Sequence, residues 1–353
     1  MAVPDRRPVL KAMAVSRRSN HAFFLLPLAL AAVAGCGLVM DSLRVLLPTP
    51  TDELDAICSR QKIRVAMAIE PTQPFVFPAI WTDEGSRVTG LDVELVREIT
   101  SALSARCGRQ GITPVLHLVQ FRNLFVELNE GKLDLFVSAV AANVPIPARA
   151  GLAYSLPYFP DSGLSGITKQ PEIAGRVRDR VGRLPDRLVP STMMKEALAG
   201  LNVAVQEGTT AQLFAEANLA ESRLVLCDSL PAAFESQDPP IDVILGKEPV
   251  FQYTITRVRR DWQFLASPSG QPFLLAREHY AIVMAEESYG LRRFVNDVLF
   301  QLETSGRLAE MRRRWFSERY AYPRRAATEG LPFAVEKMAA QQYQGECRKQ
   351  PGR

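Results

Sequence analysis

Hydrophobic and polar residues alternate with two different periods along most of the chain, and these periods predict strands and helices in turn. An apolar run at 63–67 predicts a strand, and apolar residues spaced four apart after Gly90 predict a helix. Runs at 115–119 and 133–140 predict two more strands, with a helix over 121–128 between them. The run at 133–140 is apolar almost throughout, which is typical of parallel strands covered by helices on both faces. This order of elements predicts an α/β fold.

The same alternation returns in the second half of the chain. Strands are expected at 203–205, 224–226 and 243–245, with short helices over 210–217 and 231–235. A second α/β unit therefore follows the first, which agrees with the two domains that the length suggests.

Two later stretches differ from this alternation. Residues 171–190 carry five arginines without apolar periodicity, so a solvated surface insertion is expected there, with a partner-docking loop as the alternative. A strand at 280–284 and helices over 291–316 then complete the periodic pattern. The remainder is polar, and residues 331–353 are expected to form a flexible tail.

The first forty residues carry a separate signal. Two arginines precede an apolar run from Ala22 to Ala34 that ends at Cys36, an order typical of a secretion signal. The sequence VAGC also resembles a bacterial lipobox, so residues 1–36 are expected to be a signal or lipoprotein segment with Cys36 as the lipidated residue. Because the apolar run continues to Met40, an uncleaved anchor is an alternative, as is simple secretion. Each alternative predicts a periplasmic or other extracytoplasmic protein, tethered to the membrane in the first two cases.

Composition excludes several function classes. The net charge is only +4 over 353 residues, and the chain has no basic stripe with interleaved aromatic residues, so nucleic acid is not an expected partner. The three histidines lie far apart and the five cysteines include no CxxC pair, so no metal site is expected. Nothing in the sequence calls for a cofactor.

The positions of the cysteines predict one disulfide. Cys58 lies just before the first strand, and Cys107 ends the helix that returns antiparallel to that strand, so both lie at the same end of the first unit. Since export permits oxidation, Cys58–Cys107 is the favoured pair, although the four cysteines other than Cys36 allow three pairings. Cys227, on an expected strand, could instead be a buried thiol.

Five stretches resemble one protein family, in order and at the right spacing. They are GLDVELVREI, LNEGKLDLFVSAV, RAGLAYSLPY, LNVAVQEGTTAQ and LRRFVNDVLFQLETSGRLAEMRRRWF, at 90–99, 128–140, 149–158, 201–212 and 291–316. Together they resemble the bacterial extracellular solute-binding proteins of family 3, the periplasmic substrate-binding proteins of polar amino acid ABC transporters. The resemblance covers about residues 54–316.

The resemblance implies a two-lobed, type II periplasmic-binding-protein fold with two crossing hinge strands. Lobe 1 would hold residues 54–168 and 279–330, and lobe 2 would hold residues 169–278. The protein would be a monomer that captures a small polar solute, an amino acid or a related organic acid, by hinge closure and delivers it to an ABC permease in the inner membrane. It would not be an enzyme. A cyclohexadienyl dehydratase-like enzyme is the alternative, because one fold can support both functions.

Two features of the sequence could bind the carboxylate of such a solute. Gly208, Thr209 and Thr210 lie between an expected strand and an expected helix, where unpaired N–H groups attract anions; simple N-capping is the alternative. The resemblance also assigns Arg149 to a carboxylate clamp, which suits the forked guanidinium. The spacing around Arg149 departs from the family pattern, so a surface ion pair is the alternative there.

Two departures from the family pattern concern the rest of the solute. Thr72 stands where the family usually has an aromatic residue, so Phe75 is expected to provide the stacking surface unless it belongs to the core. Lys247 stands where amino-acid binders carry an aspartate that pairs with the α-ammonium. Two ligand classes follow: an amino acid bound through Glu248, or a carboxylate without an amine bound through Lys247.

Overall fold

The computed structural model describes residues 53–70, 72–83, 85–108, 111–143, 151–184, 186–333 and 345–350. The segment 1–36 with its expected lipidation site Cys36 lies outside these residues, as does Arg149, so both remain predictions. Within the described ranges, we find no helix with the length and hydrophobicity of a membrane span.

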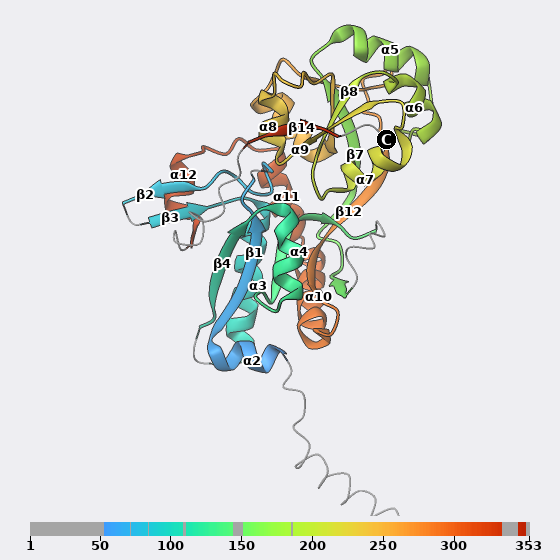
Figure 1. The fold of residues 1–353 in the computed structure, drawn as a ribbon. Coiled ribbons are helices and arrows are strands. Elements are labelled where there is room, and N and C mark those ends of the chain that lie inside the picture. The colour runs from blue at the N-terminus through green and yellow to red at the C-terminus, as the bar shows by residue number, and fades with distance from the viewer. Residues whose placement is uncertain are drawn as a thin grey trace, which may run out of the picture. The chain divides into compact units, whose positions relative to one another are not determined.

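Two long strands, β7 (Phe159–Thr168) and β12 (Ala276–Ala285), pair antiparallel in the middle of an eleven-stranded sheet (Figure 1). On the side of β12 lies the first half-sheet: β5 (Leu135–Ala141), β1 (Lys62–Ala68) and β4 (Thr113–Val119), parallel to one another. On the side of β7 lies the second half-sheet: β10 (Val243–Lys247), β8 (Asn202–Gln206) and β9 (Arg223–Cys227), also parallel. The short strands β6 (Leu152–Tyr154) and β11 (Gln263–Phe264) pair with β12 and β7. The exact division into two lobes stays a prediction.

Helices with apolar stripes pack around the first half-sheet. The helix α3 (Leu91–Cys107) buries Leu91, Leu95, Ile99 and Leu103, the four-residue spacing seen in the sequence. The other helices of this part are α2 (Glu53–Arg60), α4 (Phe121–Asn129), α10 (Tyr289–Thr304) and α11 (Arg307–Phe316). Gly90, just before α3, has a φ of +143°, and a Cβ there would lie 2.1 Å from the Phe75 carbonyl oxygen. Only glycine permits this close approach.

The second half-sheet has its own helices and its own core. They are α5 (Pro171–Val181), α6 (Ser191–Leu198), α7 (Thr210–Asn218), α8 (Leu230–Glu235) and α9 (Glu248–Arg257). Apolar residues of α5, α6 and α7 form one buried cluster with the apolar residues of β8 and β10. Figure 1 shows α5 and α6 beside this part of the sheet.

The expectation of a surface insertion without periodicity over 171–190 is wrong for its first half. Residues 171–181 form α5, which buries Ile173, Ala174, Val177 and Val181 at three-to-four spacing. The arginines of this helix occupy the positions between the buried residues, so it is an amphipathic helix that completes a core.

The flexible tail expected over 331–353 is wrong for the residues that the structure describes there. After α12 (Arg324–Glu329), β13 (Leu331–Phe333) pairs with β3 (Gly85–Val88), which also pairs with β2 (Ile80–Thr82). The last strand, β14 (Cys347–Lys349), pairs antiparallel with β9 and covers that edge of the large sheet.

The described cysteines form two disulfides. Cys58 and Cys107 are joined, with Cα atoms 5.2 Å apart, and this is the pair that the sequence favours. The alternative of a buried thiol at Cys227 is wrong, because Cys227 is joined to Cys347 with Cα atoms 4.1 Å apart. The second bridge therefore fixes β14 to the sheet covalently.

The two disulfides differ in the length of chain that they enclose, 49 against 120 residues of sequence separation. We expect the double variant Cys227→Ser/Cys347→Ser to lose about 0.8 kcal/mol more unfolding free energy than Cys58→Ser/Cys107→Ser, from loop entropy alone. Urea unfolding of the oxidised wild type and both double variants measures this difference. A greater loss for Cys58→Ser/Cys107→Ser would contradict the expectation.

Candidate functional site

The carboxyl ends of the parallel strands carry the polar residues of the candidate site, where open α/β sheets bind ligands. The first half-sheet contributes Glu70, Phe121 and Arg122. The second half-sheet contributes Glu207 to Thr210, Asp228 and Lys247. We call these two groups of residues the facing edges. The two edges contact each other. Arg122 Nη1 lies 3.3 Å from Glu207 Oε2, and Lys247 Nζ lies 5.2 Å from the centroid of the Phe121 ring.

Glu70 supplies a buried carboxylate to the facing edges. It follows β1, is only 2% exposed, and accepts the Phe121 N–H at 3.1 and 3.2 Å from its two oxygens. Burial raises the pKa of Glu70 to about 7, with a smaller contribution from the Asp228 carboxylate, while hydrogen bonds and Arg122 act in the opposite direction. Sequence reasoning missed this residue, although an acid directly after a buried strand was the signal available.

The turn from β8 into α7 contains Gly208, Thr209 and Thr210, as the sequence predicts. Thr209 is the N-cap, and its side-chain oxygen accepts the Gln212 N–H. The Gly208 N–H donates to Gln212 Oε1 at 2.8 Å, and the Thr210 hydroxyl donates to Glu278. N-capping is therefore present, and the binding of a solute carboxylate by this turn stays a prediction.

Gly208 also brings the two edges close together. Its φ is +74°, and a Cβ built there would lie 3.3 Å from Arg122 Cβ and 3.9 Å from Phe121 Cδ1. A larger residue would be strained in this conformation and would press on the first turn of α4. The glycine thus permits the approach of α7 to the opposite edge.

Lys247 and Glu248 are consecutive but lie in different surroundings. Lys247 ends β10, is 9% exposed, and contacts the Phe121 ring. Its ammonium also lowers the pKa of the buried Asp92 carboxyl, as do the hydrogen bonds from Tyr158 and Ala139. Burial is the larger effect, and the pKa of Asp92 is raised to about 7. Glu248 begins α9, and Arg187 Nη2 lies 2.5 Å from its carboxylate. Its use for a solute ammonium stays a prediction, in competition with Arg187.

Phe75 lies within an aromatic cluster and has no exposed surface. Its ring centroid is 5.1 to 5.5 Å from those of Phe159, Tyr280 and Phe316, all in edge-on contact. The core alternative therefore describes its position, and stacking on a solute stays a prediction. Thr72, also buried, leaves its hydroxyl without a hydrogen bond among the described atoms.

The described residues bring together no group of three or more His, Cys, Asp or Glu side chains that could hold a metal ion. The facing edges contain the N-terminus of α7 and the ammonium of Lys247 on the second half-sheet, and the buried carboxyl of Glu70 on the first. Such a set of groups can bind and orient a small polar molecule.

Residues 65–318 match the family described as bacterial extracellular solute-binding proteins, family 3. A mutant of ArgBP from T. maritima is similar in structure, with 25% identity, a TM-score of 0.57, and 75% of this chain and 99% of that chain covered. An amino acid ABC transporter substrate-binding protein from Streptococcus pneumoniae bound to L-arginine has 23% identity and a TM-score of 0.59, with 74% of this chain and 97% of that chain covered. An ancestral amino acid-binding protein, described as a precursor of cyclohexadienyl dehydratase, has 19% identity and a TM-score of 0.58, with 75% of this chain and 100% of that chain covered. No curated protein sequence is similar enough to count as a relative.

The buried acid at the facing edges gives a pH-dependent prediction. The pKa of Glu70 is about 7 in the folded chain and near 4.5 when unperturbed, so the folded state binds the proton more tightly and its stability falls as pH rises between these values. Glu70→Gln removes this loss. The free energy of unfolding of the variant, relative to wild type, should therefore increase by about 3 kcal/mol from pH 4.5 to 7.

Urea unfolding of wild type and Glu70→Gln at several pH values measures this difference. A difference that stays constant with pH would mean that Glu70 keeps an ordinary pKa, and would remove it from the buried groups of the site. Glutamine retains an acceptor for the Phe121 N–H, so the variant tests the charge and not the hydrogen bond.

Proposed function

Because the chain belongs to the bacterial extracellular solute-binding proteins of family 3 and has their type II periplasmic-binding-protein fold, we propose that it is the receptor of an ABC-type uptake system. It binds a small solute that carries a carboxylate, an amino acid or a related organic acid, at the facing edges and delivers it unchanged to a permease in the inner membrane. It acts as an extracytoplasmic monomer, tethered through lipid on Cys36 or through an uncleaved anchor.

One observation carries this proposal: the facing edges place groups of opposite charge on opposite sides. The start of α7 and the ammonium of Lys247 lie on one side, and the buried carboxylate of Glu70 lies on the other. A helix start and a cation favour a solute carboxylate, and an acid favours a solute ammonium. A zwitterion satisfies both sides, which supports an amino acid. The neighbour bound to L-arginine agrees with this class.

An organic acid without an amine is the second candidate solute. Glu248, which could have bound an ammonium, is paired with Arg187, whereas Lys247 is buried at the site. If Glu70 binds its proton near neutral pH, the facing edges present a cation and a neutral acid. That combination favours a simple carboxylate, so the protonation of Glu70 decides between the two classes.

Matched pairs of solutes test the proposal. We expect amino acids, but not the 2-keto acids with the same side chains, to raise the melting temperature, since a ligand at 100 times its Kd adds about 2.7 kcal/mol of stability. Glu70→Gln should abolish the preference for the amino acid, and Lys247→Gln should weaken both members of a pair. If the keto acids alone stabilise the protein, the organic-acid candidate is correct. Consumption of prephenate or arogenate without any stabilisation would identify an enzyme instead.

The contact at Gly208 gives an independent test. Gly208→Ala and Gly270→Ala both place a Cβ on a residue with positive φ, +74° and +81°, but the Cβ at 270 would meet nothing within 4 Å. Each variant should lose about 1–2 kcal/mol of stability from backbone strain. Only Gly208→Ala should also weaken solute binding, because its methyl group holds the facing edges apart. Calorimetric titration of both variants with the solute identified above measures this; equal affinities would exclude the turn from the site.

A further inference from the structure

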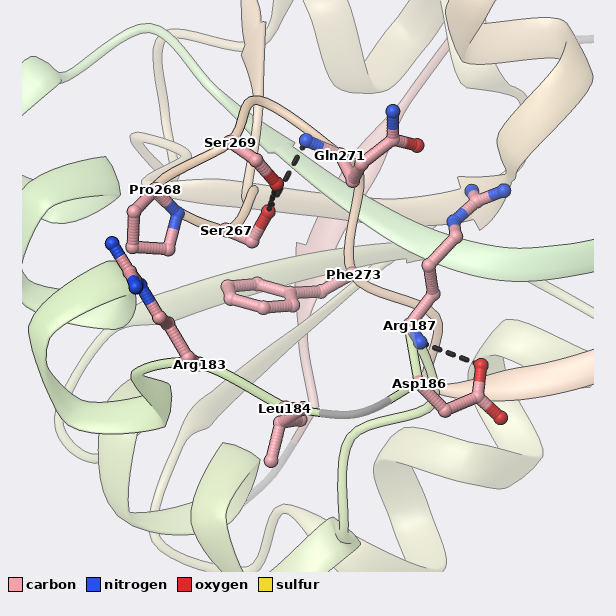
Figure 2. Close-up of a pocket in the computed structure, with 9 residues that line it drawn as sticks. All are labelled: Arg183, Leu184, Asp186, Arg187, Ser267, Pro268, Ser269, Gln271 and Phe273. Atoms are coloured by element: carbon pink, nitrogen blue, oxygen red, sulfur yellow. Dashed lines mark hydrogen bonds between the residues drawn. The ribbon is translucent and has the colours of Figure 1, made fainter.

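A pocket lies away from the facing edges, between the loop that follows α5 and the hairpin that follows β11. Its volume is about 480 Å³, within the range of small-molecule sites. Figure 2 shows Arg183 and Leu184 from the loop on one side and Ser267, Ser269 and Gln271 from the hairpin on the other. Phe273 lies between them and is 2% exposed, so it closes the floor of the pocket.

The frame of the pocket is held by hydrogen bonds of its own. The hairpin closes through Ser267 N–H to the Gln271 carbonyl oxygen at 2.9 Å, and the Ser267 hydroxyl oxygen accepts the Gln271 N–H at 3.2 Å. The loop joins the hairpin through Leu274 N–H to the Arg187 carbonyl oxygen at 2.8 Å. The hairpin wall and the Arg187 end of the loop are therefore positioned before any ligand arrives, which lowers the entropic cost of binding.

The charges of the pocket leave one cation available. Arg277 lies 2.5 Å from the Asp186 carboxylate and lowers its pKa, so this acid is compensated. Arg187 is bound to Glu248 at 2.5 Å and to the Pro272 carbonyl oxygen at 3.1 Å. Within the described part of the chain, the Arg183 guanidinium makes no hydrogen bond or ion pair. The pocket lining therefore carries one positive charge, on Arg183, that no described residue pairs.

We propose that this pocket is a second binding site, for a small carboxylate with an apolar body. The forked guanidinium of Arg183 matches a carboxylate in two parallel hydrogen bonds. The hydroxyls of Ser267 and Ser269 and the amide of Gln271 provide further donors at the rim, while Leu184 and Pro268 provide apolar walls for the body of the ligand. Arg187, which also lines the pocket, is occupied by its ion pair with Glu248, so Arg183 is the arginine that would bind the ligand.

Benzoate and its neutral isostere benzamide test the proposal on the full chain. We expect benzoate to perturb the NMR signals of the loop 182–190 and of the hairpin 265–273 in a saturable manner, and benzamide to bind about tenfold more weakly, since the charged hydrogen bonds are lost. Arg183→Gln should weaken benzoate binding by a similar factor. The matched control is Arg176→Gln. Arg176 is an exposed arginine of α5 whose guanidinium, among the described residues, bonds the Ala199 carbonyl oxygen, and its replacement should leave binding unchanged.

Three results would overturn the second site. Benzoate and benzamide could bind equally, Arg183→Gln could bind benzoate as Arg176→Gln does, or Lys247→Gln could abolish binding while Arg183→Gln leaves it intact. The last result would place the carboxylate at the facing edges and would leave the proposed receptor function standing. Conversely, benzoate binding through Arg183 does not depend on which solute the facing edges take.

Discussion

The antiparallel pairing of β7 with β12 is the constraint on which the rest of the structure depends. Each of these strands continues into a different half-sheet, because β10 pairs with β7 and β5 pairs with β12. Leu164 of β7 pairs with Lys247 on one side and with Ala276 on the other, so the register of β7 fixes the position of Lys247 at the end of β10. Glycines allow this packing: a Cβ at Gly163 would lie 2.8 Å from the Ala276 carbonyl oxygen. The place of the candidate site thus follows from strand register.

Two buried carboxyl groups stabilise the first half-sheet near this site at an electrostatic cost. Asp92 accepts the Tyr158 hydroxyl at 2.7 Å and the Ala139 N–H at 3.1 Å, and so joins α3, β5 and the segment before β7. Glu70 joins the end of β1 to the start of α4. Burial raises the pKa of both to about 7, which means that the hydrogen bonds do not fully compensate the lost hydration. Their charge near neutral pH therefore depends on the cations nearby, and Lys247 is one of them for Asp92.

Local periodicity was enough to predict the six strands of the two half-sheets and the helices α3, α4, α7, α8, α10 and α11. It did not predict the helices α2, α6 and α9, and it failed where distant residues decide. The stripe of α3 at spacing four was visible because its apolar face repeats over four turns. The short strand β14 was not predictable, since its position depends on a disulfide to Cys227, 120 residues earlier. The core position of Phe75 depends in the same way on partners at 159, 280 and 316. For α5, the buried residues at 173, 174, 177 and 181 did repeat, but the three arginines of this helix and two more just after it obscured the apolar face.

The candidate site shows how a single strand end decides the chemistry of a ligand. The sequence left Lys247 and Glu248 as alternatives, because both stand near the position where a solute ammonium would bind. Since they are consecutive residues at the passage from β10 into α9, their side chains diverge: Lys247 contacts Phe121 at the facing edges, and Glu248 contacts Arg187. The second half-sheet therefore places a cation, Lys247, at the facing edges, and the acid next to it in sequence lies against Arg187. The buried acid on the first half-sheet is Glu70. Under the proposed function, Glu70 is thus the group best placed to bind a solute ammonium, and Lys247 the group best placed to bind a carboxylate.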